Sequence, residues 1–308
     1  MLVAGPTRKD ARRKNDKPAI VWDVSRSSPH HGRVYLAWTV LDGVGVVVSH
    51  SDDDGSHWSR PVAVVRASDV RVGFYASLAV GQDGDLYVAW TDPSREIVVA
   101  RSTDGGASFG QPVLVDTVVG LPGDSLPHGG QAVPAQPRRG VTVAGTVVAN
   151  VSRVFVVYGA PGSDRREQDV RAVAFDPRLV RVHRPVQVNP PDGKVASDQF
   201  EPVAALNPRT GSLWVCFYDT RGDPSRRSVR YSCTASRDGI QGWKLPRPVA
   251  TVRSDVTRGD ADAFGYGDYQ GLAIGTNSVA HPVWTDNRPG TMRSAIYTTS
   301  LTERDLSR

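Results

Sequence analysis

Pairs of aspartate and arginine recur at the ends of predicted β-strands in this chain of 308 residues. Arginine follows aspartate closely in Asp219-Thr220-Arg221 and in Asp286-Asn287-Arg288, and Arg95 follows Asp92. Guanidinium groups bind carboxylates in a bidentate manner, and carboxyl groups can donate or accept a proton. These residues are therefore candidates for binding an acidic ligand and for acid–base chemistry.

A glutamate and two tyrosines stand at the starts of other short apolar strands. They are Tyr75, Glu201 in Phe200-Glu201-Pro202, and Tyr269 in Gly267-Asp268-Tyr269-Gln270-Gly271. In an antiparallel four-stranded unit, the start of the first strand and the end of the second lie at the same edge. The sequence therefore predicts that these side chains share one face with the Asp and Arg pairs.

An alternating strand that ends in an aromatic residue occurs five times and supplies this edge. The copies cover 34–38, 86–90, 154–158, 213–217 and 280–284, so that successive ends are 52, 68, 59 and 67 residues apart. Shorter apolar strands precede them, as at 19–22, 77–80, 202–206 and 271–274. Repeats of this length are typical of the four-stranded blades of an all-β propeller.

A turn motif, S-x-D-x-G-x-x-aromatic, follows the third strand of some units. It is intact at 51–58 and 102–109, and at 236–243 it is altered, with the glycine one place early. Serine and aspartate side chains bind nearby backbone groups, and glycine permits a positive φ. We expect a tight turn built by Ser51, Asp53, Gly55 and Trp58, by Ser102, Asp104, Gly106 and Phe109, and by Ser236, Asp238 and Trp243.

This motif resembles the Asp box, or bacterial neuraminidase repeat, of sialidase-like β-propellers. The resemblance implies one propeller domain over residues 1–308, in a six-bladed family fold of which this chain carries about five blades. An N-terminal blade is then missing, or the strand-like Leu2–Gly5 closes the ring. The third unit has lost its Asp box and keeps Asp176, and 120–140 is predicted to be a long surface loop.

Sialidases use a tyrosine nucleophile, a glutamate that takes its proton, an acid aspartate and three arginines that bind the substrate carboxylate. The resemblance implies Tyr269 and Glu201 as the nucleophile pair and Arg221 and Arg288 as two of the arginines. Arg95, Asp219 and Asp286 are further candidates for binding substrate. The family's Arg-Ile-Pro motif is absent from the sequence, and Asp16 or Asp23 are weak candidates for the acid.

Composition limits the other functions. The net charge is +5, but the basic residues form no stripe with interleaved aromatics, so nucleic-acid binding is not expected. The basic cluster at 8–17 is expected to be a solvated arm. No apolar run is long enough to span a membrane, and no metal-ligand or cofactor motif occurs. We expect a monomer without metal or cofactor whose partners are glycans or glycoconjugates.

Two cysteines, Cys216 and Cys233, flank a predicted hairpin loop. They could form a cross-strand disulfide, which suits an oxidising compartment, or remain reduced thiols. The N-terminus lacks the pattern of a signal peptide. We expect a secreted or cell-surface protein whose natural start lies upstream of Met1.

Two functions remain open. The chain is a hydrolase that removes terminal sialic acid or a similar acidic sugar, or it is a non-catalytic propeller that binds glycan or protein. In the second case Asp92 and Asp219 would form ion pairs that order loops, and Glu201 and Tyr269 would be core residues. Converging arginines with Tyr269 on Glu201 would favour the enzyme. Pairing of Arg221 with Asp219 and of Arg288 with Asp286 would favour binding.

Overall fold

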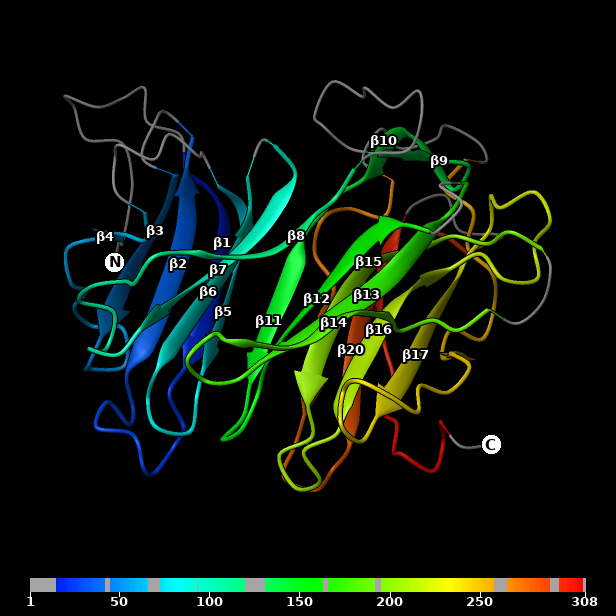
Figure 1. The fold of residues 1–308 in the computed structure, drawn as a ribbon. Helices are drawn as coiled ribbons and strands as arrows, with labels where there is room; N and C mark the ends of the chain where they lie inside the picture. The colour runs from blue at the N-terminus through cyan, green and yellow to red at the C-terminus, as the bar shows by residue number, and fades with distance from the viewer. Residues whose placement is uncertain are drawn as a thin grey trace. The chain divides into compact units, whose positions relative to one another are not determined.

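The computed structural model describes residues 15–41, 45–65, 73–92, 94–119, 131–162, 166–191, 195–257, 265–288 and 294–306. Every helix or strand element assigned in these residues is a strand, and none is a helix. They form a β-propeller of five antiparallel blades, most of them four-stranded (Figure 1), so the predicted fold class is confirmed. No helix in the described part of the chain is long and apolar enough to cross a bilayer.

Each blade is built from consecutive strands. The first contains β1 (Asn15–Trp22), β2 (Val34–Val40), β3 (Gly45–Ser51) and β4 (Val62–Ala63). The second contains β5 (Phe74–Val80), β6 (Leu86–Thr91), β7 (Glu96–Ser102) and β8 (Val113–Thr117). The third contains β11 (Gly145–Ala149), β12 (Val154–Pro161), β13 (Gln168–Phe175) and β14 (Arg181–Gln187).

The fourth blade contains β15 (Gln199–Leu206), β16 (Leu213–Asp219), β17 (Arg230–Ser236) and β18 (Arg247–Pro248). The fifth is a three-stranded sheet of β19 (Gly271–Ile274), β20 (Ala280–Asp286) and β21 (Ala295–Thr298). A separate hairpin is formed by β9 (Gln131–Val133) and β10 (Gln136–Val141). The prediction of a surface loop over 120–140 is therefore wrong for 131–140, and 120–130 lie outside the described residues.

The second strand of each blade explains the aromatic-ending pattern of the sequence. β6, β12 and β16 are buried at every position. Because both faces of such a strand are covered, apolar residues are favoured at consecutive positions. In β20 the pattern changes to alternate buried and exposed residues, with Trp284 buried and Val283 exposed. Burial therefore covers only one face of the second strand in the last blade.

The chain divides into two compact units, each with its own core, and the division falls within the third blade. In the unit that contains the first two blades, side chains of β2, β3, β6 and β7 pack together around Tyr35, Leu86 and Trp90. In the unit that contains the last two blades, the core is largely aromatic, with Trp214, Tyr218, Tyr231 and Trp284 at its centre. The hairpin β9–β10 adds Val133 and Val141 to this second core.

A disulfide joins Cys216 and Cys233 inside the core of the second unit. The two residues are directly opposed on β16 and β17, and both are fully buried. The sequence left the thiol and disulfide forms open, and the structure contains the bond.

The Asp boxes are turns that join the third and fourth strands of the first, second and fourth blades. In the first copy, the hydroxyl of Ser51 donates to Asp53 at 2.8 Å and accepts from the amide of Gly55 at 2.9 Å. The second copy repeats this arrangement in Ser102, Asp104 and Gly106. In the third blade, Asp176 still accepts two backbone amides in the turn before β14.

The predictions for the two ends of the chain can be compared with the structure only in part. The strand-like segment Leu2–Gly5 and residues 8–14 of the basic cluster lie outside the described residues. The third strand of the last blade is found as β21, and Leu301 pairs with Ala280 in an isolated bridge.

Candidate functional site

Glu201 lies in a β-bulge at the start of β15, the first strand of the fourth blade. The register between β15 and β16 shifts between Phe200 and Val203, and Glu201 has a φ of 51°. A positive φ is unfavourable for a residue with a side chain and often marks a functional position. The same bulge places Lys17 at 53° and Tyr75 at 57° in the first two blades. The propeller therefore repeats one irregular backbone position at the edge where the sequence predicted a site.

Glu201 is buried, and two glutamines bind its carboxylate. Gln136 donates to Oε1 at 2.9 Å and Gln270 donates to Oε2 at 3.1 Å. Gln136 is itself fixed, because its Oε1 accepts the amide of Tyr266 and its Nε2 also donates to the carbonyl of Gly140. The carboxylate thus ties the hairpin β9–β10 to the fourth and fifth blades.

Burial raises the pKa of Glu201 to about 7, although the bonds from the two glutamines and the charge of Arg139 act in the opposite direction. Loss of hydration disfavours the ionised form of a carboxyl group. Burial also raises the pKa of the nearby Tyr218 and Tyr231 phenols, and the charge of Glu201 raises it further. Arg139 forms an ion pair with Asp268 close to this cluster.

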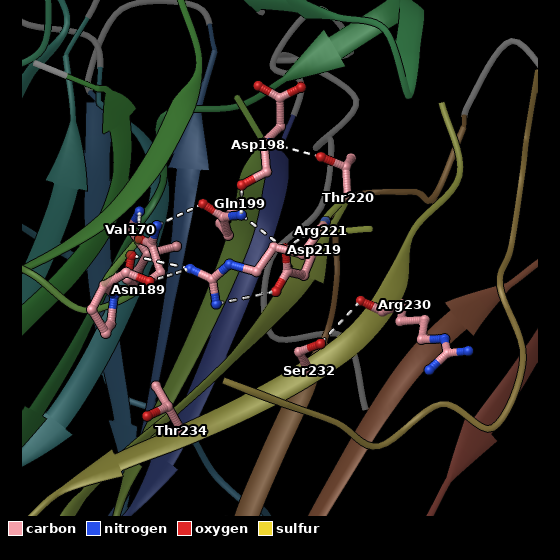
Figure 2. Close-up of polar contacts among 12 residues, drawn as sticks. Val170, Asn189, Asp198, Gln199, Asp219, Thr220, Arg221, Arg230, Ser232 and Thr234 are labelled. Carbon is pink, nitrogen blue, oxygen red and sulfur yellow. Dashed lines mark hydrogen bonds and ion pairs between the residues drawn. The ribbon is translucent and has the colours of Figure 1, made fainter. Parts of the chain in front are cut away.

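Arg221 contacts Asp219 of its own blade and the backbone of the segment that precedes this blade. Its Nη2 donates to the carbonyl oxygens of Asn189 at 3.2 Å and Pro190 at 2.7 Å, and its Nη1 lies 3.6 Å from Asp219 Oδ2. Figure 2 shows the guanidinium lying between Asp219 and Asn189. Asp219 also accepts from Gln199 at 2.8 Å. Arg221 thus forms part of an ordered polar network within the protein.

The network continues through buried amides to a second ion pair. Asn189 donates to Gln199 and to Asp169, whose pKa is raised by burial. Asp198, which is fully buried, receives Arg226 in a bidentate ion pair and the amide of Gln168 at 3.0 Å. This arrangement holds the loop after β16 against the start of β15.

Arg288 is also paired within its blade. Its Nε donates to Asp286 Oδ2 at 3.0 Å, and its guanidinium lies 3.8 Å from the ring centre of Tyr297. Asp286 is 1% exposed. The two pairs, Asp219 with Arg221 and Asp286 with Arg288, are therefore the arrangement that was expected of a binding protein.

Tyr269 lies at the surface, with 58% of its area exposed, and the next residue in sequence is Gln270, which binds Glu201. Asp268, on its other side, is anchored by Arg139. In the other unit, Asp92 is buried and accepts the amide of Glu96 at 2.9 Å, while the amide of Arg95 donates to the Asp92 carbonyl.

The two weak candidates for an acid both bind nearby backbone amides. Asp16 accepts the amide of Lys17 at the bulge of β1. Asp23 is fully buried, accepts the amide of Ser25 and the hydroxyl of Ser28, and orders the turn after β1. Because that turn follows β1, Asp23 lies at the opposite end of β1 from the bulge between Asp16 and Ala19.

Sequence reasoning missed the glutamines and the ion pair around Glu201. Gln136 and Arg139 lie in the segment that was predicted to be a loop, and Gln270 and Asp268 flank Tyr269. A signal existed, because Gln136 stands among the apolar residues Val133, Ala135 and Val141, all of them buried. Among the described residues, no group of three or more His, Cys, Asp or Glu side chains is arranged to hold a metal ion.

No protein-family model and no curated protein sequence matches this chain. Its fold is similar to several solved structures. A protein of unknown function from Dyadobacter fermentans matches with a TM-score of 0.56 and 13% identity, over 95% of this chain and 80% of that one. The Hadza microbial sialidase Hz136 matches with a TM-score of 0.55 and 15% identity, over 92% of this chain and 56% of that one.

An ulvan lyase of polysaccharide lyase family 25 matches with a TM-score of 0.53 and 12% identity, over 98% of this chain and 70% of that one. At these identities the likeness establishes the fold, a propeller shared with carbohydrate-active proteins.

Proposed function

We propose that this protein binds carbohydrate at the face that carries Tyr269, without sialidase chemistry. The observation that carries the proposal is the exposed ring of Tyr269 between two anchored polar residues, Asp268 and Gln270. A sugar ring presents an apolar C–H face, which packs on an aromatic ring, and hydroxyl groups, which bind polar side chains. The structures of similar fold include a sialidase and an ulvan lyase, which is consistent with such a ligand.

The arginines argue against the sialidase mechanism. A sialidase uses its arginines to bind the substrate carboxylate, whereas here Arg221 binds two backbone carbonyls and Asp219. Arg288 binds Asp286 and stacks on Tyr297. Both guanidinium groups would have to leave partners inside the protein before they could bind a ligand, and a buried aspartate left without its partner is costly.

One observation favours a hydrolase as the second candidate. The pKa of Glu201 is raised by burial to about 7, so this carboxyl group is partly protonated at neutral pH. Glycoside hydrolases commonly raise the pKa of a carboxyl group in this way to obtain a proton donor. Glu201 would then be the acid, and turnover would require it.

The experiment is a binding and turnover assay on natural and variant chains. Binding to an array of neutral and acidic oligosaccharides is measured for the natural chain, Tyr269→Ala and Tyr269→Phe. Loss of binding in the alanine variant with retention in the phenylalanine variant supports stacking on the ring. Trp22→Ala, at an aromatic residue of similar exposure on β1, is the matched control.

Turnover is measured on a fluorogenic sialoside. Hydrolysis by the natural chain that is lost in Tyr269→Phe would establish a retaining sialidase and refute the proposal. Hydrolysis that is lost only in Glu201→Gln would support the second candidate. A folded chain that binds no oligosaccharide on the array would refute both.

A further inference from the structure

A cavity of about 490 Å³ lies at the Asp-box end of the fourth blade. Its walls come from three segments that are far apart in sequence: Ser212 before β16, the altered Asp box at 236–244, and the C-terminal segment at Glu303 and Leu306. The volume is within the range of about 300–1,000 Å³ that is usual for sites of small molecules. Neither the sialidase resemblance nor the Tyr269 face accounts for this cavity.

The altered Asp box forms one wall of the cavity. In the intact first copy, the indole of Trp58 donates to the carbonyl of Gly55 at 3.0 Å and so closes the turn. In the third copy the early Gly239 donates to Ser236, and Ile240 and Gln241 both donate to Asp238. Within the described residues, the buried indole N–H of Trp243 finds no acceptor.

Trp243 stands between Gly242 and Lys244, both of which line the cavity. The hydrogen bonds of this turn therefore differ from those of the first copy, and the turn places Gly242 and Lys244 in the cavity wall.

Two carboxylates are fixed in the cavity wall. Glu303 Oε1 accepts from Ser212, from Thr210 at 3.0 Å and from Asn207 at 3.4 Å. The bond from Ser212 is the chief cause of the lowered pKa of Glu303, so this group is ionised at neutral pH. Backbone amides of its own turn likewise lower the pKa of Asp238. Both acceptors are therefore held in place before any ligand arrives.

The remaining lining balances these charges. Arg237 and Lys244 add two cations, Gln241 adds an amide, and Ala235 and Leu306 add apolar surface. A phosphate would be repelled by Glu303 and Asp238, and an amine would be repelled by Arg237 and Lys244. The lining as a whole therefore favours neither an anionic nor a cationic ligand. A neutral ligand that is rich in hydroxyl groups can use donors, acceptors and apolar surface together.

We propose that this cavity is a binding site for a neutral saccharide unit. It lies at the opposite end of the fourth blade from Glu201: β16 begins beside Ser212 and ends at Asp219, a length of about 20 Å. The site is thus separate from the Tyr269 face and stands whether or not that face binds carbohydrate. If both bind, one protein can hold two glycan segments at once, which increases avidity.

The test is saturation-transfer NMR with glucose, galactose, mannose, arabinose and their common disaccharides, with inorganic phosphate as a competitor. We expect at least one sugar to receive saturation from the natural chain. Arg237→Ala and Gln241→Ala, both at exposed side chains, are expected to weaken it at least tenfold. Arg60→Ala, an exposed arginine after the first Asp box, is the control and is expected to leave binding unchanged.

Tyr269→Ala separates this proposal from the proposed function. A signal that survives Tyr269→Ala but is lost in Arg237→Ala supports the cavity alone. A signal lost only in Tyr269→Ala, the absence of any signal, or displacement of the sugar by phosphate at equal concentration would each overturn the assignment. Thermal unfolding of every variant checks that the fold is retained.

Discussion

Replacing Glu201 by glutamine is expected to make the protein more stable at neutral pH than the natural chain. The buried carboxylate must be ionised above its pKa of about 7 in the folded state, whereas in the unfolded state it ionises near 4.5. The folded state therefore binds more protons between these values, and stability falls as the pH rises through this window. Glutamine removes that charge and keeps the shape of the side chain.

The magnitude follows from the two pKa values. At about 1.4 kcal/mol for each pH unit, the window from 4.5 to about 7 corresponds to about 3 kcal/mol that the natural chain loses and the variant does not. The new amide can be accommodated. Gln136 is fixed by Tyr266 and Gly140, but rotation of the Gln270 amide by 180° would present an oxygen to the new N–H group.

The assay is urea unfolding followed by tryptophan fluorescence, from pH 5 to pH 8, on the natural chain and on Glu201→Gln. The stability of the variant relative to the natural chain is expected to rise by about 2.5 kcal/mol between pH 5 and pH 8, and the rise is expected to level off above about pH 7. Glu303→Gln is the matched control. The pKa of Glu303 is lowered, so its contribution to stability is lost only on acidification and leaves this range flat. A difference between Glu201→Gln and the natural chain that is independent of pH would refute the reasoning.

Two further perturbations test the framework of the same unit. The disulfide closes a loop with a sequence separation of 17, so Cys216→Ala with Cys233→Ala is expected to cost about 3 kcal/mol; a reductant should lower the melting temperature of the natural chain but not that of the double variant. Arg226→Ala leaves the charge of buried Asp198 without its partner and is expected to cost about 3–5 kcal/mol in urea unfolding. Arg227→Ala, at an exposed neighbour, is the control, and an equal effect there would contradict this role of the pair.

The fold could be predicted from the sequence because its signals are local. The Asp box closes because the side chains of Ser51 and Asp53 accept hydrogen bonds from backbone amides four residues further along the chain, so the motif is complete within one turn. The second strand of a blade can also be recognised in the sequence. Burial on both faces favours apolar residues at consecutive positions, as in β16.

The site was harder to predict because its contacts are distant in sequence. Glu201 was named from its place before a strand, but its partner Gln136 lies 65 residues away and glutamine carries no spacing pattern of its own. Arg221 was assigned to a ligand from its residue type, and the structure gives it the carbonyls of Asn189 and Pro190, which any residue could supply. A sequence motif therefore identifies a candidate side chain, but it does not predict the atoms that this side chain contacts in the folded protein.

The most direct test of the central claim is one NMR experiment that reports binding and cleavage in the same tube. Saturation transfer from the protein to a set of oligosaccharides that includes sialyllactose and arabinobiose reports binding, and new anomeric signals report hydrolysis. Carbohydrate binding at the Tyr269 face predicts saturation of at least one oligosaccharide, its loss in Tyr269→Ala, and no new anomeric signal over a day. Release of sialic acid, or no saturation of any oligosaccharide, would contradict it.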